Sequence, residues 1–261
     1  MNKTIITTSW DDGSREDLRV SRLLNTFNLK GTFYVLQARE FRSLTDEEIK
    51  ELSKTQEIGA HTLNHYDLTK LSLVRAKKQI IGSKKNLEDI LHKPIKMFCY
   101  PKGKYNSEIK EIVQEANFLG ARTTKEFSFR EPKDFFEFGA ALHVYPFPLR
   151  KRDREHYHLS RFLFQPLGRK FFKILKLGLP FSSFLNWPNL AKALFDYVYK
   201  NGGIYHLWGH SWEVERYGMW LELEDLFRYI SRRENVLYLT NGQALEFFRV
   251  RPSLGSDPHN L

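Results

Sequence analysis

Short runs of β-branched and apolar residues alternate along the chain with longer segments in which apolar residues recur every three or four positions. The first run, KTIITTSW, ends at Asp11 and is typical of a buried strand. Apolar residues then recur at helical spacing from Leu18 to Phe27, and Gly31 opens the next strand, GTFYVL. The alternation continues along most of the chain and predicts parallel strands with helices packed around them.

The remaining elements follow from the same signals. Two capping boxes, Thr45 with Glu48 and Thr240 with Gln243, mark the starts of helices. Further strands are expected at EIGAH, IKMFCY, FLGARTT, GAALHVY, GGIYHLW and NVLYL. Further helices are expected where apolar residues form stripes, within 73–91, 109–116, 190–199 and 223–230.

One region, residues 149–187, breaks this rhythm. It is basic and aromatic, and it lacks the alternation that is typical of a strand. The chain length of 261 residues is within the usual range of an α/β barrel. We therefore expect a single domain over residues 1–261 that carries 149–187 as an insertion.

A helix is expected inside this insertion. Lys170, Lys173 and Lys176 fall along one face of it, and the remaining positions are mostly apolar. This composition suits a helix that lies in a membrane interface. The alternative is a lid helix that packs on the barrel or on a second protomer, with its lysines in water.

The chain is strongly basic, with a formal net charge of +10 and a pI near 9.5. Such a surplus attracts polyanions or anionic membrane surfaces but does not determine a fold. Cys99 is the only cysteine, which excludes an internal disulfide and fits a reducing compartment. The N-terminus lacks a secretory h-region, and no apolar stretch approaches the roughly 20 residues needed to span a bilayer. These features predict a cytoplasmic protein, although an exported form without its leader would look the same.

Two groups of polar residues follow predicted strands. Asp11 and Asp12 stand side by side before Gly13, where their mutual repulsion requires a cation or a proton to compensate it. His61 and His65 follow the third strand, and their spacing of four is the spacing that metal sites use. Each feature also has an ordinary explanation, namely a turn with a helix cap for the aspartates and a pair of surface histidines.

A third segment, GGIYHLWGHSWE, strengthens both signals. It places His206 and His210 on one face of a strand and its extension. Strand ends in a barrel converge on one side, so segments that are distant in sequence can meet there. Two histidines and one carboxylate, with an open position for water, form a familiar catalytic zinc set.

The order of these motifs resembles the polysaccharide deacetylase (NodB-homology) family, carbohydrate esterase family 4. The family's first motif, an aromatic residue followed by Asp-Asp-Gly, is matched by WDDG at 10–13, and its second, His-(Ser/Thr)-x-x-His, by HTLNH at 61–65. LNTFNLKGTFYV resembles the stretch between these motifs, FCYPKGKYN resembles the third motif, and GHSWE resembles the histidine segment near the end. The resemblance covers most of residues 4–145 and about 188–249, and it implies a distorted (β/α)7–8 barrel.

The resemblance also implies roles for individual residues. Asp12, His61 and His65 would hold a divalent metal, with zinc expected and cobalt, manganese or nickel as alternatives. Asp11 would be the general base toward water that the metal activates, and His210 the general acid toward the departing amine. The implied reaction removes acetyl groups from an N-acetylated sugar, in a polysaccharide, an oligosaccharide or a lipid-linked glycan.

The chain departs from the family pattern in two places. Cys99 stands where the third motif usually begins with an arginine that orients the catalytic aspartate. We hypothesise that Arg122, on the next predicted strand, supplies the missing guanidinium, and the alternative is an ordinary surface ion-pair residue. The family's usual fourth motif, an Asp-rich segment before Trp, is not recognisable, so substrate contacts are not defined by it.

Several other residues are candidates for contacts with substrate. Tyr100, Pro101 and Lys102 would form the oxyanion site, with a backbone N–H near Lys102 as the donor. Four residues near predicted strand ends could contact a sugar, although core packing explains them as well: His143, Tyr145, Trp208 and Trp212. We expect Cys99 to be a packing residue, and His206 to be a core histidine bonded to backbone.

Two other functions stay open. One rival keeps the metal site but acts on a small non-sugar amide. The other is a catalytically inactive barrel whose basic, aromatic insertion binds glycan or nucleic acid. The residues that would carry out hydrolysis are all present, which argues against the inactive barrel and against nucleic acid as the partner. They are Asp11, Asp12, His61, His65 and His210. The sequence does not indicate an oligomeric state.

Overall fold

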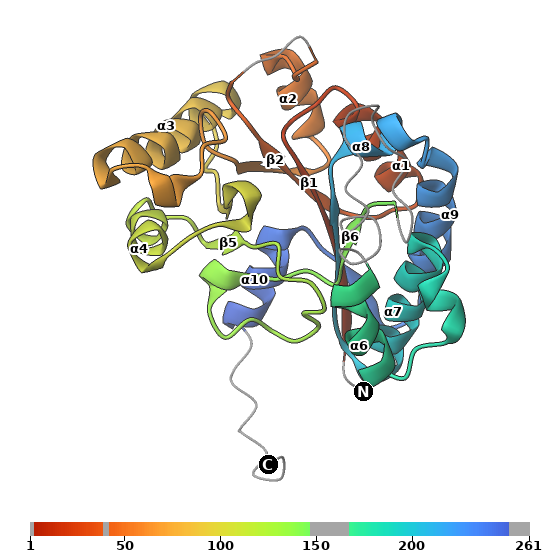
Figure 1. Cartoon of the computed structure of the whole chain (residues 1–261). Coiled ribbons are helices and arrows are strands. Elements are labelled where there is room, and N and C mark those ends of the chain that lie inside the picture. Colours follow the sequence, from red (N-terminus) through yellow and green to blue (C-terminus); the bar gives the residue numbers. More distant parts are fainter. Residues whose placement is uncertain (1–2, 39–41, 147–166, 251–261) are drawn as a thin grey trace, which may run out of the picture.

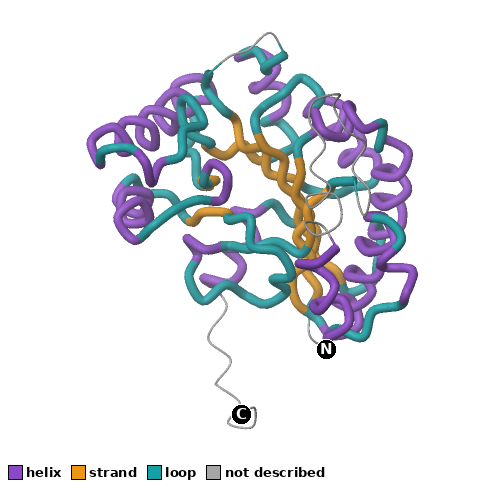
Figure 2. Tube along the Cα trace, viewed as in Figure 1, coloured by secondary structure: helices purple, strands orange, loops and turns teal. Residues whose placement is uncertain are grey.

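The computed structural model describes residues 3–38, 42–146 and 167–250. Within these residues a parallel, 8-stranded sheet curls into half a barrel, and helices cover its outside (Figures 1 and 2). The expected α/β barrel-like class is therefore confirmed.

The strand order is β5-β4-β3-β2-β1-β7-β6, and β8 pairs with β1 off this path. The strands are β1 Thr4–Asp11, β2 Gly31–Val35, β3 Glu57–Ala60, β4 Met97–Cys99, β5 Gly120–Arg122, β6 Leu142–Val144, β7 Gly203–Gly209 and β8 Val236–Tyr238.

The α-helices lie between the strands, as the alternating pattern predicts. They are α1 Asp17–Thr26, α2 Asp46–Leu52, α3 Leu73–Leu91, α4 Ser107–Glu115, α6 Leu167–Lys176, α7 Trp187–Asn201, α8 Ser211–Tyr217, α9 Trp220–Ile230 and α10 Asn241–Val250. Short 3-10 helices are η1 Leu68–Lys70, η2 Pro101–Gly103, η3 Phe135–Glu137 and η4 Phe181–Phe184.

The centre of the sheet is β1. Its second half pairs with β2 from Thr8 to Asp11, its first half pairs with β8 from Thr4 to Ile6, and β7 runs along its other edge. Every residue of β1 is buried. A parallel strand covered on both faces has no need of alternating polar residues, which explains its run of β-branched residues.

A segment before β6 brings the two ends of the sheet together. Phe138 bridges to Arg122 at the end of β5, and Ala141 N donates to His206 O in β7 at 2.7 Å. The edge strand β5 is thereby held near β7 although the strand order places them far apart. As a result, the carboxyl ends of β1, β5 and β7 come close to one another.

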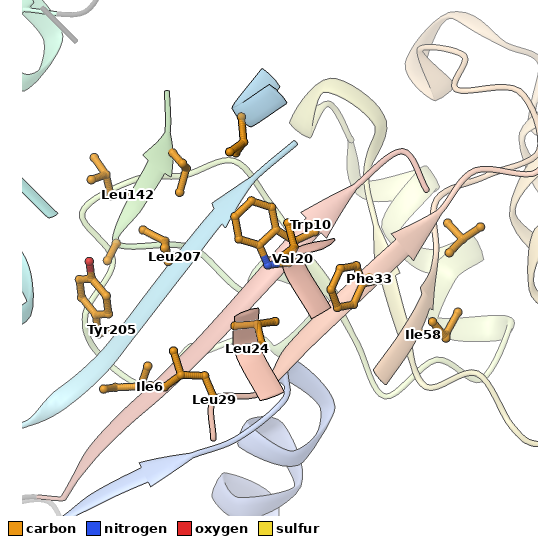
Figure 3. Close-up of a cluster of buried hydrophobic side chains, with 14 of the residues drawn as sticks. Ile6, Trp10, Val20, Leu24, Leu29, Phe33, Ile58, Leu142, Tyr205 and Leu207 are labelled. Carbon is orange, nitrogen blue, oxygen red and sulfur yellow. The ribbon is translucent and has the colours of Figure 1, made fainter. Parts of the chain in front are cut away.

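Helix α1 packs its apolar side on the sheet. Val20 and Leu24 of this helix and Trp10 and Phe33 of the sheet have no exposed surface, and Figure 3 shows them in one cluster. Phe227 of α9 meets the Trp10 ring edge-on at 6.4 Å between centroids. Burial of each of these large side chains contributes about 1.5–3 kcal/mol, so the cluster fixes the strand that ends at Asp11.

The sequence-based expectations agree with the strands and with all of the α-helices except one. The Thr45 box forms, with Glu48 N donating to Thr45 Oγ1 at 3.2 Å and Thr45 N to Glu48 Oε2 at 2.8 Å. Helix α8 was not expected, because seven residues are too few to display a helical stripe. Of the insertion at 149–187, residues up to 166 lie outside the described residues, and the rest contains α6, η4 and the start of α7.

A buried asparagine attaches α10 to the sheet. Asn241 has no exposed surface, and its Nδ2 donates to Tyr34 Oη at 2.9 Å. Its Oδ1 accepts from Thr7 Oγ1 at 2.7 Å, and its backbone N donates to Thr32 Oγ1 at 2.8 Å. One amide therefore satisfies polar groups of β1 and β2 that have no water around them.

Replacing this amide tests the arrangement. Asn241→Ala leaves the Thr7 and Tyr34 hydroxyls buried without that partner, so the free energy of unfolding falls by about 2–4 kcal/mol. Denaturant unfolding measures the loss. Gln114→Ala on the exposed side of α4 is the control, with an expected change within about 0.5 kcal/mol. Equal effects of the two substitutions would contradict the network.

Candidate active site

The residues that the sequence singles out come together at the carboxyl ends of the strands. Asp11 is the last residue of β1, Cys99 of β4 and Arg122 of β5, while His61 directly follows β3 and His210 directly follows β7. In a parallel sheet these ends lie on one side, which is where barrel proteins build their sites.

Asp12, His61 and His65 form a donor set for a cation. The Asp12 Oδ1 atom lies 3.6 Å from His61 Nε2 and 3.7 Å from His65 Nε2, and the ligand atoms of all three residues are within 4.8 Å of one another. Asp12 Oδ1 is buried and has no hydrogen-bond donor among the described residues. The other oxygen, Oδ2, accepts from Trp212 Nε1 at 3.0 Å. One carboxylate oxygen is therefore left to face two imidazoles.

The two histidines present their metal-binding nitrogens to this space. His61 Nδ1 lies 2.9 Å from the Cys99 carbonyl oxygen, which can only accept, so Nδ1 carries the proton and Nε2 keeps its lone pair. Burial and the neighbouring His61 lower the pKa of His65, which favours the neutral ring that binds metals.

The backbone at this donor set is in the left-handed region, which most side chains avoid. Asp12 has φ 79°, Thr62 has φ 69° and His65 has φ 54°. Such conformations cost on the order of 1–3 kcal/mol each for residues other than glycine and concentrate where function requires them. His65 N donates to Thr62 Oγ1 at 3.0 Å, which holds the turn between the two histidines.

Asp11 adjoins this set, with a carboxylate oxygen within 4.8 Å of a His61 ring nitrogen, and is buried beside Arg122. The Nη2 atom of Arg122 donates to Asp11 Oδ1, and Cys99 Sγ lies 3.8 Å from Asp11 Oδ2. Cys99 and Arg122 are register partners on adjacent strands, so a guanidinium on β5 reaches the place next to Cys99. Arg122 is 0% exposed, and the surface ion-pair alternative is therefore wrong. Its guanidinium also lies over the Trp208 ring at 4.6 Å.

The charge of Asp11 is set by opposing effects. Burial alone would raise its pKa, but Arg122 and then His61 and His210 lower the pKa to about 2. Asp11 is therefore ionised throughout the physiological range. A carboxylate this acidic is a weak base by itself and suits water that a Lewis acid has already activated.

His210 belongs to a second cluster that sequence reasoning missed. Its Nδ1 lies 2.7 Å from Glu213 Oε2, and its Nε2 lies 3.7 Å from Asp12 Oδ2. His143 Nε2 is 3.3 Å from the same Glu213 oxygen, and its ring stacks on Trp208 with 3.9 Å between centroids. The available signal was Glu213 itself, three residues after His210 in the first turn of α8.

Burial would lower the pKa of His210, but the Glu213 carboxylate, with Asp11 and Asp12, raises it instead. Burial would raise the pKa of Glu213, but the neighbouring His143 and the hydrogen bond to His210 lower it to about 2. Glu213 is therefore a fixed negative charge that stabilises the imidazolium of His210.

A hydroxyl network joins the two loops that carry Asp12 and His210. Ser211 Oγ donates to Asp17 Oδ1 at 2.5 Å and lies 2.8 Å from Ser14 Oγ. Asp17 and Ser211 have no exposed surface. The loop after β1 and the loop after β7 are consequently held together, although about 200 residues of chain separate them.

The other candidates occupy different surroundings. The Tyr100 ring is buried, stacked on Tyr105 at 4.6 Å, so its side chain belongs to the core. Pro101 is buried at the start of η2, and Lys102 after it is exposed with φ 58°. Trp212 donates its indole N–H to Asp12, and contact between its ring and a sugar stays a prediction.

Two expected packing residues lie where the sequence suggests. His206 Nδ1 bonds to the Gly139 carbonyl oxygen at 2.8 Å, its Nε2 lies 2.9 Å from Ser9 Oγ, and it is buried. Cys99 is also buried. Both side chains support the strand ends without entering the donor set.

Comparisons with known proteins agree with these motifs. Residues 1–121 match the family model "Polysaccharide deacetylase". Over 121 residues the chain is 24% identical to "Putative polysaccharide deacetylase YxkH" of Bacillus subtilis, covering 45% of this chain and 43% of the relative. The resemblance to the polysaccharide deacetylase family is confirmed. The chain spans less than half the length of that curated relative.

Solved structures extend the likeness of fold over the whole chain. A putative polysaccharide deacetylase from Mycobacterium smegmatis aligns with a TM-score of 0.69 at 14% identity, covering 99% of this chain and 96% of its own. A deacetylase-family pseudoenzyme from Bacillus anthracis aligns with a TM-score of 0.52 at 13% identity, covering 94% of this chain and 66% of its own. A fold of this kind therefore does not by itself establish activity.

The buried ion pair can be tested by its stability. Arg122→Ala leaves the Asp11 carboxylate buried without its partner, and we expect a loss of about 3–5 kcal/mol in the free energy of unfolding. The double variant Asp11→Asn/Arg122→Ala removes both charges and should lose less than the sum of the single changes. Strictly additive losses in denaturant unfolding would show that the two side chains do not interact.

Proposed function

We propose that this protein is a metal-dependent hydrolase that removes acetyl groups from N-acetylated sugars. The main support for the proposal is that the adjacent residues Asp11 and Asp12 have different partners. Asp12 faces two imidazoles, and Asp11 is bound by Arg122 beside them. The family resemblance supports deacetylation as the reaction.

The donor set fits a divalent cation. One buried carboxylate oxygen without a donor, and two imidazole nitrogens with free lone pairs, are the ligands of catalytic zinc sites with an open position. The same set accepts cobalt, manganese or nickel, and zinc is our first expectation. A cation held there would supply Lewis-acid activation of water and of the acetyl carbonyl.

The surrounding residues divide the proton transfers between them. Asp11, ionised and oriented by Arg122, accepts a proton from the attacking water. His210, whose pKa Glu213 raises and whose Nε2 lies 3.7 Å from Asp12 Oδ2, donates a proton to the amine that leaves. The backbone N–H near Lys102 is the proposed donor to the carbonyl oxygen in the transition state. The amide bond breaks, and acetate and a free amine result.

The direct experiment is an acetate-release screen. N-acetylglucosamine oligomers are compared with small non-sugar amides, using protein loaded with zinc or cobalt. Release from the oligomers alone supports the proposal. Release from the small amides alone would support the metal site but show that the substrate is not a sugar. Absence of release from every metal-loaded sample would favour an inactive barrel.

Loss of one ligand should remove the metal and the activity together. His65→Asn is expected to reduce bound metal to a small fraction of the normal content and acetate release by at least about a hundredfold. His92→Asn is the matched control, since His65 and His92 both have positive φ, which asparagine tolerates. Arg122→Ala should instead retain metal and lose turnover. Full metal content in His65→Asn would refute the donor set.

The charge on Glu213 should govern the alkaline limit of activity. A general acid works below its own pKa, and Glu213 raises the pKa of His210. Glu213→Gln keeps a hydrogen-bond acceptor but removes the charge, so the alkaline limb of kcat/KM should move to lower pH. Glu215→Gln in the same helix is the control. If the alkaline limb of kcat/KM does not move in Glu213→Gln, His210 is not a general acid whose pKa Glu213 raises.

A further inference from the structure

An apolar surface at α6 and η4 stands outside the site described above. Four aromatic rings follow one another across it, with centroids 5.5 Å apart from Phe172 to Phe171, 5.3 Å from Phe171 to Phe184 and 5.8 Å from Phe184 to Phe181. Phe172 is 76% exposed and Phe181 is 78% exposed. We call this surface the aromatic face and define it by these four residues with Leu175 and Leu185, which are also exposed.

The aromatic face is attached firmly to the protein. Ile174 on the opposite side of α6 is fully buried. Lys170 Nζ bonds to Glu126 Oε1 at 2.9 Å, and Lys173 lies over the Phe127 ring at 5.1 Å. The exposed rings therefore belong to a helix that packs firmly on the rest of the protein.

The charges beside the aromatic face are mainly basic. Residues 156–195 contain no Asp or Glu. Lys170 and Lys192 pair with Glu126 and Asp225 from elsewhere in the chain, whereas Lys173 and Lys176 of α6 have no ion-pair partner among the described residues. Apolar rings on the outside with lysines along the helix match the two requirements of interfacial binding, namely insertion and attraction to anionic headgroups. A net charge of +10 adds to the attraction.

We infer that the aromatic face binds an anionic lipid surface. No described helix is long and apolar enough to cross a bilayer. Self-association through this face would bring Lys173 and Lys176 of two copies together without an acidic residue from the same segment between them, which disfavours a second copy as the occupant.

A short chain of hydrogen bonds connects α6, which carries the aromatic face, with the proposed active site. Glu126 Oε1 accepts from Lys170 of α6 and also from the backbone N of His143 at 2.9 Å. His143 in turn adjoins Glu213. Two hydrogen bonds therefore link the lipid-facing helix to the strand that borders His210.

Vesicle flotation with the full chain tests the inference. We expect the protein to float with vesicles of phosphatidylcholine containing about one third phosphatidylglycerol and not with phosphatidylcholine alone, and the bound fraction to fall at high salt. Phe172→Ser/Phe181→Ser should weaken binding to the anionic vesicles at least about tenfold. Val74→Ser/Leu221→Ser is the matched control, because those residues are 82% and 80% exposed on other helices.

Three results would overturn the inference. They are absence of binding to anionic vesicles at low salt, equal binding by the two double variants, and a dimer in sedimentation that Phe172→Ser/Phe181→Ser dissociates. Thermal unfolding of both variants shows that each is folded before flotation. None of these results depends on deacetylase activity, so the membrane inference and the proposed function fail separately.

Discussion

The compensation of two adjacent carboxylates at the end of β1 is the constraint on which the site depends. Asp11 and Asp12 are consecutive. Asp11 ends a fully buried strand, and Asp12 follows it with its side chain 24% exposed. Each ionised carboxylate there costs several kcal/mol unless an opposite charge or hydrogen bonds offset it. The fold treats them separately. Asp11 is paired with the Arg122 guanidinium, while Asp12 accepts an indole N–H on Oδ2 and leaves Oδ1 beside His61 with no donor among the described residues.

The topology makes this separation possible. β4 and β5 follow β3 along one wing of the sheet, and β7 borders β1 on the other. The Phe138 bridge and the Ala141 hydrogen bond draw the wings together, so Arg122 reaches Asp11 although β5 and β1 are not neighbours. A flat sheet of the same order would leave that aspartate without its partner.

Much of this could be predicted from sequence, because the signals were local. The β-branched run of β1, the capping box at Thr45 and the spacing of His61 and His65 each lie within a few residues. The prediction of Arg122 was less local. It started from the absence of an arginine at Cys99 and placed the guanidinium on the next strand, and in the structure Cys99 and Arg122 are register partners on β4 and β5. The metal role of the histidines is still a prediction.

What could not be predicted was set by three-dimensional context. Glu213 is one acidic residue among many in the sequence, and only the turn of α8 places it on His210 Nδ1. The hydrogen bond from the Trp212 N–H to Asp12 joins residues that are 200 positions apart, so no local pattern indicated it. Whether Phe172 is packed or exposed depends on how α6 is oriented, which its composition leaves undecided.

The left-handed turn at Asp12 completes the separation of the two aspartates. Consecutive residues of a strand point to opposite sides, and Asp11, still within β1, points to Arg122. Asp12 leaves the strand with φ 79°, and Gly13 follows with φ 67°. A residue with extended backbone at position 12 would continue the strand direction and carry its carboxylate away from His65. The strain at Asp12 is therefore a requirement of the donor set, and the buried strand behind it, fixed by Trp10, supplies the packing energy that sustains it.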